Sequence, residues 1–263
     1  MRNSVPLIFI SLLGCVTADF RSAQEMLREQ KYYNAIELYL SFVREHPEHR
    51  RAPEALLEVA NIHMTMLNDP KKALSTYQAL VAKYPVNKFT LKGQQKIAEL
   101  EEEVFADFRQ AIVEYEKLIQ AAPKDPKAAD YQYEIARCYT QLHNYEQADL
   151  EYKAVLDNYP KYAKLDEVYY QKANSAYIGG KYEDAVRGYQ TVIRKFPKSE
   201  HLIPAKFGLG TAYEELEEWD NAKNAYEAVL KDYPSPKVVE IRIKGVEERK
   251  KKKMTLSGGA KLR

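Results

Sequence analysis

Cysteine is nearly absent from this 263-residue sequence, which contains only Cys15 and Cys138. Two cysteines cannot staple a small disulfide scaffold or complete a usual zinc site. Glycine (10) and proline (12) are also sparse, which excludes a collagen-like chain and a disordered chain rich in both. Charged residues make up 30% of the sequence, too many for a protein with several membrane spans. The chain must therefore fold by burying apolar surface.

Positive charge is concentrated at the C-terminus. Residues 249–263 contain seven basic residues and no acidic one, so the rest of the chain carries a net charge of −5 within a total of +2. A nucleic-acid-binding protein normally has a basic face, so no nucleic acid is expected as a partner. The run from Arg249 to Lys253 has two other interpretations: a solvated tail, or a contact with an anionic surface such as lipid headgroups or cell-wall polymer.

The first residues have the features of an export signal. Arg2 provides a positive start, and residues 5–13 are an apolar stretch too short to span a bilayer. The sequence LLGC at 12–15 resembles the lipobox of bacterial lipoproteins. The resemblance implies a signal peptide over residues 1–14, lipidation of Cys15, a short tether over residues 15–19, and sorting to the outer membrane. A plain secretory signal or a buried anchor helix is the alternative.

The dominant pattern is a repeat. Six sixteen-residue segments each contain an alanine (residues 35, 73, 111, 148, 185 and 222) and end in a proline (residues 47, 85, 123, 160, 197 and 234). Both series advance by 38, 38, 37, 37 and 37 residues. Apolar residues four and seven positions after the alanine share its face, which predicts a helix that the proline ends. A second helix precedes each segment, and Ala136, Ala173 and Gly210 mark its close approach to a neighbour.

This succession of helix, short turn, helix and proline resembles the tetratricopeptide repeat (TPR). The resemblance covers residues 20–235 and implies an all-α fold, a right-handed superhelical solenoid of about six helix-turn-helix repeats. Residues 236–248 are predicted to form an amphipathic capping helix over the open end of the stack. Residues 249–263 have no apolar period and are predicted to be a basic disordered tail.

The sequence contains nothing that indicates catalysis. Gly179 and Gly180 are interpreted as a turn, and His46 and His49 have no carboxylate at helical spacing to complete a metal site. Cys138 is interpreted as a buried structural residue, and the carboxylates at 101–103 as a solvated helix face. No enzyme activity, cofactor or metal is therefore expected.

A binding surface is what remains. Side chains on the first helix of each pair, opposite its packing face, are predicted to be exposed and to line a groove for protein partners: Tyr133, Arg137, Tyr170, Asn174, Tyr177, Phe207 and Thr211. Aromatic residues with an arginine and an asparagine are typical of peptide recognition. The alternative is that these aromatic residues pack between repeats.

The repeat period exceeds the usual 34 residues, and the extra residues follow the proline. Together with the lipobox, this resembles the outer-membrane lipoprotein branch of the TPR family, the BamD and YbgF (Tol–Pal-associated) type. The resemblance implies a scaffold that is lipid-anchored on the periplasmic face of the outer membrane and binds protein partners or extended peptides in β-barrel protein assembly. The alternative is an envelope or division coordinator that regulates peptidoglycan enzymes or a Tol–Pal-type complex. A cytosolic co-chaperone that binds C-terminal carboxylates is disfavoured. Such a clamp needs lysine and asparagine on the groove helices, and only Asn174 matches.

Overall fold

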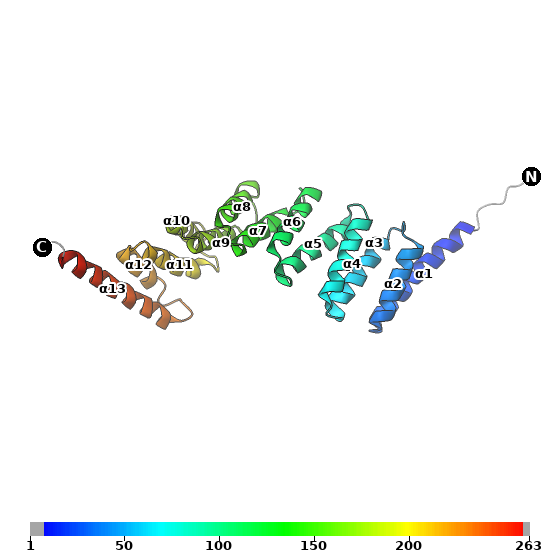
Figure 1. Cartoon of the computed structure of the whole chain (residues 1–263), viewed down its shortest axis with the longest axis horizontal. Helices are drawn as coiled ribbons and strands as arrows, with labels where there is room; N and C mark the ends of the chain where they lie inside the picture. Colours follow the sequence, from blue (N-terminus) through cyan, green and yellow to red (C-terminus); the bar gives the residue numbers. More distant parts are fainter. Residues whose placement is uncertain (1–7, 260–263) are drawn as a thin grey trace, which may run out of the picture. The chain divides into compact units, whose positions relative to one another are not determined.

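The computed structural model describes the backbone of residues 8–259 and the side chains of residues 18–255. Within this range the chain forms thirteen α-helices and one π-helical segment and contains no strand (Figure 1). The predicted all-α fold is confirmed. The elements are α1 (Ile8–Arg28), α2 (Tyr32–Glu45), α3 (Ala52–Asn61), η1 (Ile62–Met66), α4 (Pro70–Lys83), α5 (Lys88–Glu103), α6 (Phe108–Ala121), α7 (Ala128–Gln141), α8 (Tyr145–Asn158), α9 (Leu165–Ile178), α10 (Tyr182–Lys195), α11 (Leu202–Glu215), α12 (Trp219–Glu227) and α13 (Pro236–Gly259).

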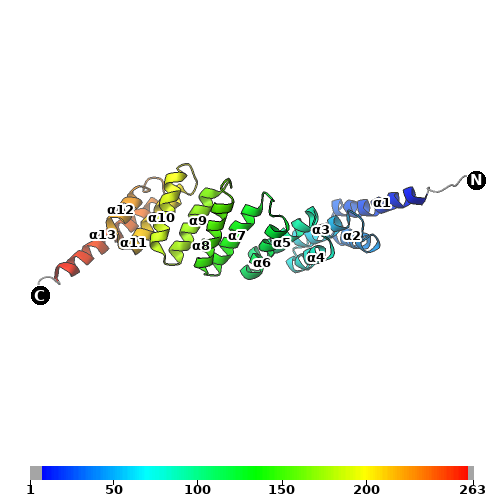
Figure 2. The same cartoon turned by 90° about the horizontal axis from the view of Figure 1, so that it is seen from above.

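The helices divide into two compact units, residues 1–128 and 129–263. The helices pair in chain order as six repeats, in which the first helix is called A and the second B. Repeats 1 to 3 (α1/α2, α3–η1/α4 and α5/α6) form the first unit. Repeats 4 to 6 (α7/α8, α9/α10 and α11/α12) and α13 form the second unit, in which α9, α10 and α11 pack side by side (Figure 2).

The turns between helix A and helix B share one backbone feature in all six repeats. One residue in each turn adopts a left-handed backbone conformation, and it always lies five positions before the recurring alanine: Gln30, Asn68, Ala106, His143, Gly180 and Glu217. Glycine adopts this conformation at little cost, whereas other residues are strained there. Gly180 is therefore the residue best suited to the position, and the prediction of a turn at Gly179–Gly180 is confirmed.

The same turns explain why the first two repeat steps are one residue longer. After the left-handed residue, the N–H of Lys181 donates to the carbonyl five residues earlier, and the turns at Lys31, Asn144 and Glu218 are alike. In repeats 2 and 3 the equivalent N–H groups, of Asp69 and Asp107, reach back six residues. The extra residue thus lies at the end of helix A, and in repeat 2 the π-helical segment η1 absorbs it.

A recurring buried tyrosine accounts for much of the tyrosine excess. It lies four positions after the alanine in every B helix and is at most 3% exposed: Tyr39, Tyr77, Tyr115, Tyr152, Tyr189 and Tyr226. A buried hydroxyl requires a hydrogen-bond partner. Tyr77 donates to Asn61 at 2.7 Å and Tyr115 to Glu102 at 2.8 Å, both on helix A of the same repeat. The tyrosine therefore joins the two helices of a repeat through both its ring and its hydroxyl.

The predicted small residues lie where helices approach closely. Ala136 and Ala173 are buried, and a Cβ atom added to Gly210 would lie 2.7 Å from the ring of Tyr226. Cys138 is buried, as expected. The expectation of a solvated face at residues 101–103 is wrong for Glu101 and Glu102, which are 8% and 9% exposed, because the B helix α6 packs over this side of α5.

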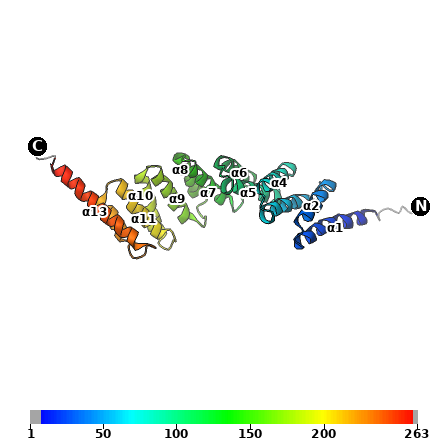
Figure 3. The ribbon, with the colours of Figure 1, turned by 60° about the horizontal axis from the view of Figure 1, so that its bottom comes forward.

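The C-terminal helix is longer than the predicted cap. Helix α13 continues from Pro236 to Gly259 (Figure 3). Its first part packs on α12 through Val239 and Val246. The expectation of a disordered tail from residue 249 is wrong as far as Gly259. Lysine is a good helix former, and acidic residues of the last repeat pair with this segment: Lys250 with Asp220, and Lys253 with Glu217.

The N-terminal helix α1 begins at Ile8 and includes residues 15–19, for which a tether was expected. Residues 1–7 and the side chain of Cys15 lie outside the described residues, so the signal peptide and the lipidation stay predictions. Among residues 8–259, none of the helices combines the length and the apolar character that a membrane span needs.

Candidate functional site

The predicted groove residues lie on α7, α9 and α11, the A helices of the second unit, but Tyr133 is not exposed. It is 3% exposed, packs against Tyr152 and donates a hydrogen bond to Glu167 at 2.8 Å. Burial, and then the bond to Glu167, raise the pKa of this tyrosine. Sequence reasoning failed at Tyr133 because the first helix of the next repeat covers it. Tyr133 therefore belongs to the core that joins repeats 4 and 5.

Tyr170 and Asn174 on α9 are half-buried. Tyr170 stacks on His201, with ring centroids 4.9 Å apart, and Asn174 accepts a hydrogen bond from the buried Tyr189 at 2.7 Å. The amide of Asn174 also donates to Gln171 at 3.2 Å. These contacts fix both side chains in one orientation, so the alternative in which the aromatic residues pack between repeats holds for Tyr170.

The remaining half-buried members are Tyr177, Phe207 and Thr211. Phe207 stacks on Tyr233, with ring centroids 4.6 Å apart. The hydroxyl of Thr211 on α11 donates to the carbonyl of Gly208 at 2.8 Å. Burial is the main cause that raises the pKa of Tyr177 on α9. Part of each side chain still reaches the surface.

Arg137 and Ile178 are exposed on this side of the helices. The Arg137 side chain is 44% exposed and pairs with Glu134 at 2.6 Å. Ile178, eight residues after Tyr170 and so on the same side of α9, is 59% exposed. Sequence reasoning missed Ile178, although its helical spacing from Tyr170 and Asn174 could have identified it. We call Arg137, Tyr170, Asn174, Tyr177, Ile178, Phe207 and Thr211 the A-helix face.

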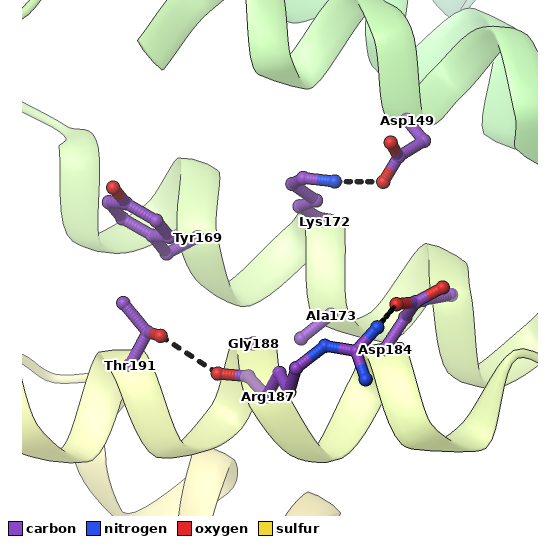
Figure 4. Close-up of a pocket in the computed structure, with 9 residues that line it drawn as sticks. Asp149, Tyr169, Lys172, Ala173, Asp184, Arg187, Gly188 and Thr191 are labelled. Carbon is purple, nitrogen blue, oxygen red and sulfur yellow. Dashed lines mark hydrogen bonds and ion pairs between the residues drawn. The ribbon is translucent and has the colours of Figure 1, made fainter.

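A second feature of this unit is a pocket of about 210 Å³ in repeat 5, formed by α9 and α10 with Asp149 of α8 (Figure 4). Two ion pairs border it, Lys172 with Asp149 and Arg187 with Asp184. Burial lowers the pKa of Lys172, while the nearby charge of Asp184 opposes this shift. The hydroxyl of Thr191 donates to the carbonyl of Arg187 at 2.8 Å. We call this the repeat-5 pocket; sequence reasoning did not identify it.

In the first unit, the structure brings together three side chains that the sequence did not connect. Ligand atoms of Asp19 on α1 and of Glu45 and His46 at the end of α2 all lie within 4.8 Å of one another. Helical spacing from His46 and His49 could not identify this group, because Glu45 is the sequence neighbour of His46 and Asp19 lies on another helix. Glu45 also accepts a hydrogen bond from Ser41 at 2.7 Å.

The fold and the A-helix face define an α-helical repeat protein with a surface on the A helices α7, α9 and α11 of its second unit. Models of the tetratricopeptide repeat match residues 54–85, 167–199 and 205–236, and a second form of the repeat matches residues 105–163. Together these matches cover more than half of the sequence. The chain belongs to the tetratricopeptide-repeat family, whose members are typically non-catalytic scaffolds that bind proteins and peptides.

Solved structures confirm the fold. A tetratricopeptide repeat protein from Parabacteroides merdae is 17% identical with a TM-score of 0.57, and the match covers 90% of this chain and 88% of that one. PilW, a type IV pilus biogenesis factor, is 14% identical with a TM-score of 0.55, over 88% of this chain and 98% of that one. YrrB, described as having an unusual peptide-binding site, is 14% identical with a TM-score of 0.57, over 78% and 97%. No curated protein matches the sequence significantly.

Proposed function

We propose that this chain is a non-enzymatic scaffold on the periplasmic side of the outer membrane, where a lipid on Cys15 anchors it. The scaffold binds protein partners through the A-helix face and acts in the assembly of β-barrel membrane proteins. The observation that carries the binding role is the exposure of Ile178, an apolar side chain, on that face. Buried apolar and aromatic anchors with an arginine are what dominate binding energy at protein interfaces. The LLGC sequence at 12–15 supports the anchor.

The A-helix face is suited to binding because its side chains are held in place before a partner arrives. Asn174 is bonded to Tyr189, and Tyr170 is stacked on His201. Side chains that are already ordered lose less conformational entropy on binding, so more of the contact energy appears as affinity. Ile178 supplies apolar area and Arg137 supplies charge-assisted donors for an extended peptide or a domain edge.

The test is capture of partners from detergent-solubilised native envelopes by the full chain, compared with a variant carrying Arg137→Glu and Ile178→Asp. Both positions are exposed, so the variant should fold normally. The proposal predicts that the unaltered chain retains a β-barrel assembly protein and that the variant loses it. Retention of a peptidoglycan enzyme or a Tol–Pal component instead would support the coordinator function and overturn the assembly role. Equal capture by both chains would overturn the assignment of the face.

A matched control is the pair of changes Lys153→Glu and Leu150→Asp on the B helix α8. Both residues are exposed, and the control repeats the charge and polarity changes away from the A helices. Capture should be unaffected by it.

A further inference from the structure

One position of the repeat is filled by a carboxylate in repeats 3 and 4. The position lies three residues after the recurring alanine of helix B and is Glu114 in repeat 3 and Glu151 in repeat 4. Each glutamate accepts hydrogen bonds from two glutamine amides, one on helix A and one on helix B. For Glu151 the donors are Gln132 and Gln147, both at 2.5 Å; Gln94 and Gln110 donate to Glu114 in the same way.

In repeat 5 the equivalent residue is Gly188, and the repeat-5 pocket opens there (Figure 4). A Cβ atom at position 188 would lie 2.6 Å from the Cβ of Ala173, because α9 and α10 approach closely at this point. A side chain from position 188 therefore cannot fill the space. The two glutamine positions are also changed, to Tyr169 and Asp184.

The pocket contains a lysine at a position where repeats 2, 3, 4 and 6 have an apolar residue. Lys172 occupies the position before the small residue of helix A, which is the buried Ile135 in repeat 4. Its partner Asp149 follows the recurring alanine of repeat 4, and the equivalent residue in repeat 5 is the buried Val186. Between repeats 5 and 6 the corresponding residues are Val186 and Leu209, which pack in one apolar cluster. Replacing an apolar pair by a partly buried ion pair does not usually gain stability, so stability alone does not explain Lys172 and Asp149.

Lys172 and Arg187 have more N–H donors than their ion pairs use. Lysine has three N–H donors and arginine five, and Lys172 and Arg187 each have one carboxylate partner among the described side chains. A third cation, Lys195, lies 5.0 Å from the ring centroid of Tyr169 at the edge of the pocket. Within the lining, Asp149 and Asp184 balance Lys172 and Arg187, and Lys195 adds a positive charge beside Tyr169.

We infer that the repeat-5 pocket binds a carboxylate that a partner peptide supplies, in the place that Glu114 and Glu151 occupy in their own repeats. The carboxylate is bound by Arg187 and Lys172, and its source is either an acidic side chain or a peptide C-terminus. This inference rests on the proposed peptide-binding function and adds a charge preference to it. The pocket involves α8, α9 and α10 and none of the residues of the A-helix face.

The experiment is a titration of the ¹⁵N-labelled full chain with small carboxylates, followed through the amide resonances of Gly188 and Thr191. N-acetylglutamate α-amide presents a side-chain carboxylate, N-acetylalanine presents a main-chain carboxylate, and N-acetylglutamine α-amide is the neutral match. We expect saturable shifts with the first two probes and none with the third. The tighter of the two carboxylates identifies the source. Equal shifts with the glutamine compound, or none with either carboxylate, would overturn the inference.

Two variants assign the donors. Arg187→Gln should weaken the carboxylate response about tenfold, as expected for the loss of one charge-assisted interaction. Arg194→Gln, an exposed change on the same helix, is the control and should leave the response unchanged. The double change Asp149→Ile with Lys172→Ile imitates the apolar pairs of the other repeats; it should keep or raise the melting temperature and abolish the response. A double variant that binds the probes as the unaltered chain does would contradict the assignment.

The two proposals fail separately. If the probes do not bind while capture from envelopes still depends on Arg137 and Ile178, the pocket assignment alone is wrong. If the probes bind but the Arg137→Glu and Ile178→Asp variant captures partners normally, the pocket stands and the A-helix face is wrong.

Discussion

The carboxylate of Glu214 in α11 lies 2.9 Å from the guanidinium of Arg249 in α13. Glu214 is 4% exposed and also accepts a hydrogen bond from the buried Tyr226 at 2.5 Å. The guanidinium of a second arginine, Arg242, lies 3.8 Å from the Glu214 carboxylate. A buried carboxylate needs such partners, because an unpaired charge in the interior is costly. Helix α13 is thus bound to the last repeat by charge as well as by Val239 and Val246, and the basic run that begins at Arg249 is part of the fold.

Replacing Glu214 should loosen the C-terminal end. Glu214→Ala leaves the hydroxyl of Tyr226 without its acceptor and Arg249 without its buried partner, which should lower the free energy of unfolding by about 1–3 kcal/mol. Urea titration measures the loss, and hydrogen exchange should show it in α13. The neighbouring Glu215 is exposed, so Glu215→Ala is the control. Equal effects of the two changes would show that the buried pair does not hold the helix.

Substitutions at the left-handed turn position should change stability in opposite directions in repeats 5 and 3. Gly180→Ala should destabilise the protein by about 1 kcal/mol, and Ala106→Gly should stabilise it by a similar amount, because the left-handed conformation disfavours a Cβ atom. Ala79 is an exposed residue inside α4, and Ala79→Gly should destabilise by about 0.5–1 kcal/mol. Thermal unfolding of the three variants gives the signs. Stabilisation by Gly180→Ala would contradict the common geometry of the turns.

Titration of the Glu101 carboxyl should make the free energy of unfolding depend on pH in the acidic range. Burial raises the pKa of this carboxyl, and the charges of Asp107 and Glu114 add to the shift. The folded state therefore holds the proton more tightly than the unfolded chain, so this group costs stability as pH rises from the unfolded value of 4.5 through the raised folded value. Glu101→Gln should be more stable than the unaltered chain at pH 7.

That gain should disappear as the pH falls below 4.5, where the carboxyl is protonated in both states. Denaturant titrations at several pH values measure it. Glu103 is exposed on the same helix, and Glu103→Gln should change little at any pH. A gain for Glu101→Gln that is the same at pH 4 and pH 7 would contradict the titration.

The repeats could be predicted from sequence because alanine and proline recur at fixed spacing and because each repeat folds against its nearest neighbours. The alanines at 148, 185 and 222 lie in B helices as expected, and Gly210 lies under Tyr226. The extra residue of the first two steps was visible in the spacing, but the spacing could not show that it lies at the end of helix A.

The surface could be predicted only in part. Helical spacing identifies the side of α7 on which Tyr133 lies, but its burial depends on the next repeat and on the bond to Glu167, 34 positions along the chain. The disordered tail was predicted from a run of like charge, which ignores acidic partners such as Asp220 on another helix. The repeat-5 pocket depends on the absence of a side chain at Gly188, which becomes visible only when repeats are aligned on their alanines.

The N-terminal prediction is tested in cells. If Cys15 is the lipidated first residue of the mature protein, mass spectrometry of the purified protein should find an acylated N-terminal peptide that begins at Cys15, and Cys15→Ser should move the protein out of the membrane fraction. Cys138→Ser is the control for cysteine loss and should stay in the membrane fraction. A mature protein that retains residues 1–14, or that begins at an unmodified residue, would contradict the anchor.

The most direct test of the account is photo-crosslinking in cells from the A-helix face. A photoreactive residue at position 178, on α9, is compared with one at position 113, an exposed position of the B helix α6. The account predicts discrete protein adducts from position 178 that the Arg137→Glu change removes, and none of these adducts from position 113. The same adducts from both positions, or none from position 178, would contradict the claim that this protein holds its partners on the A helices.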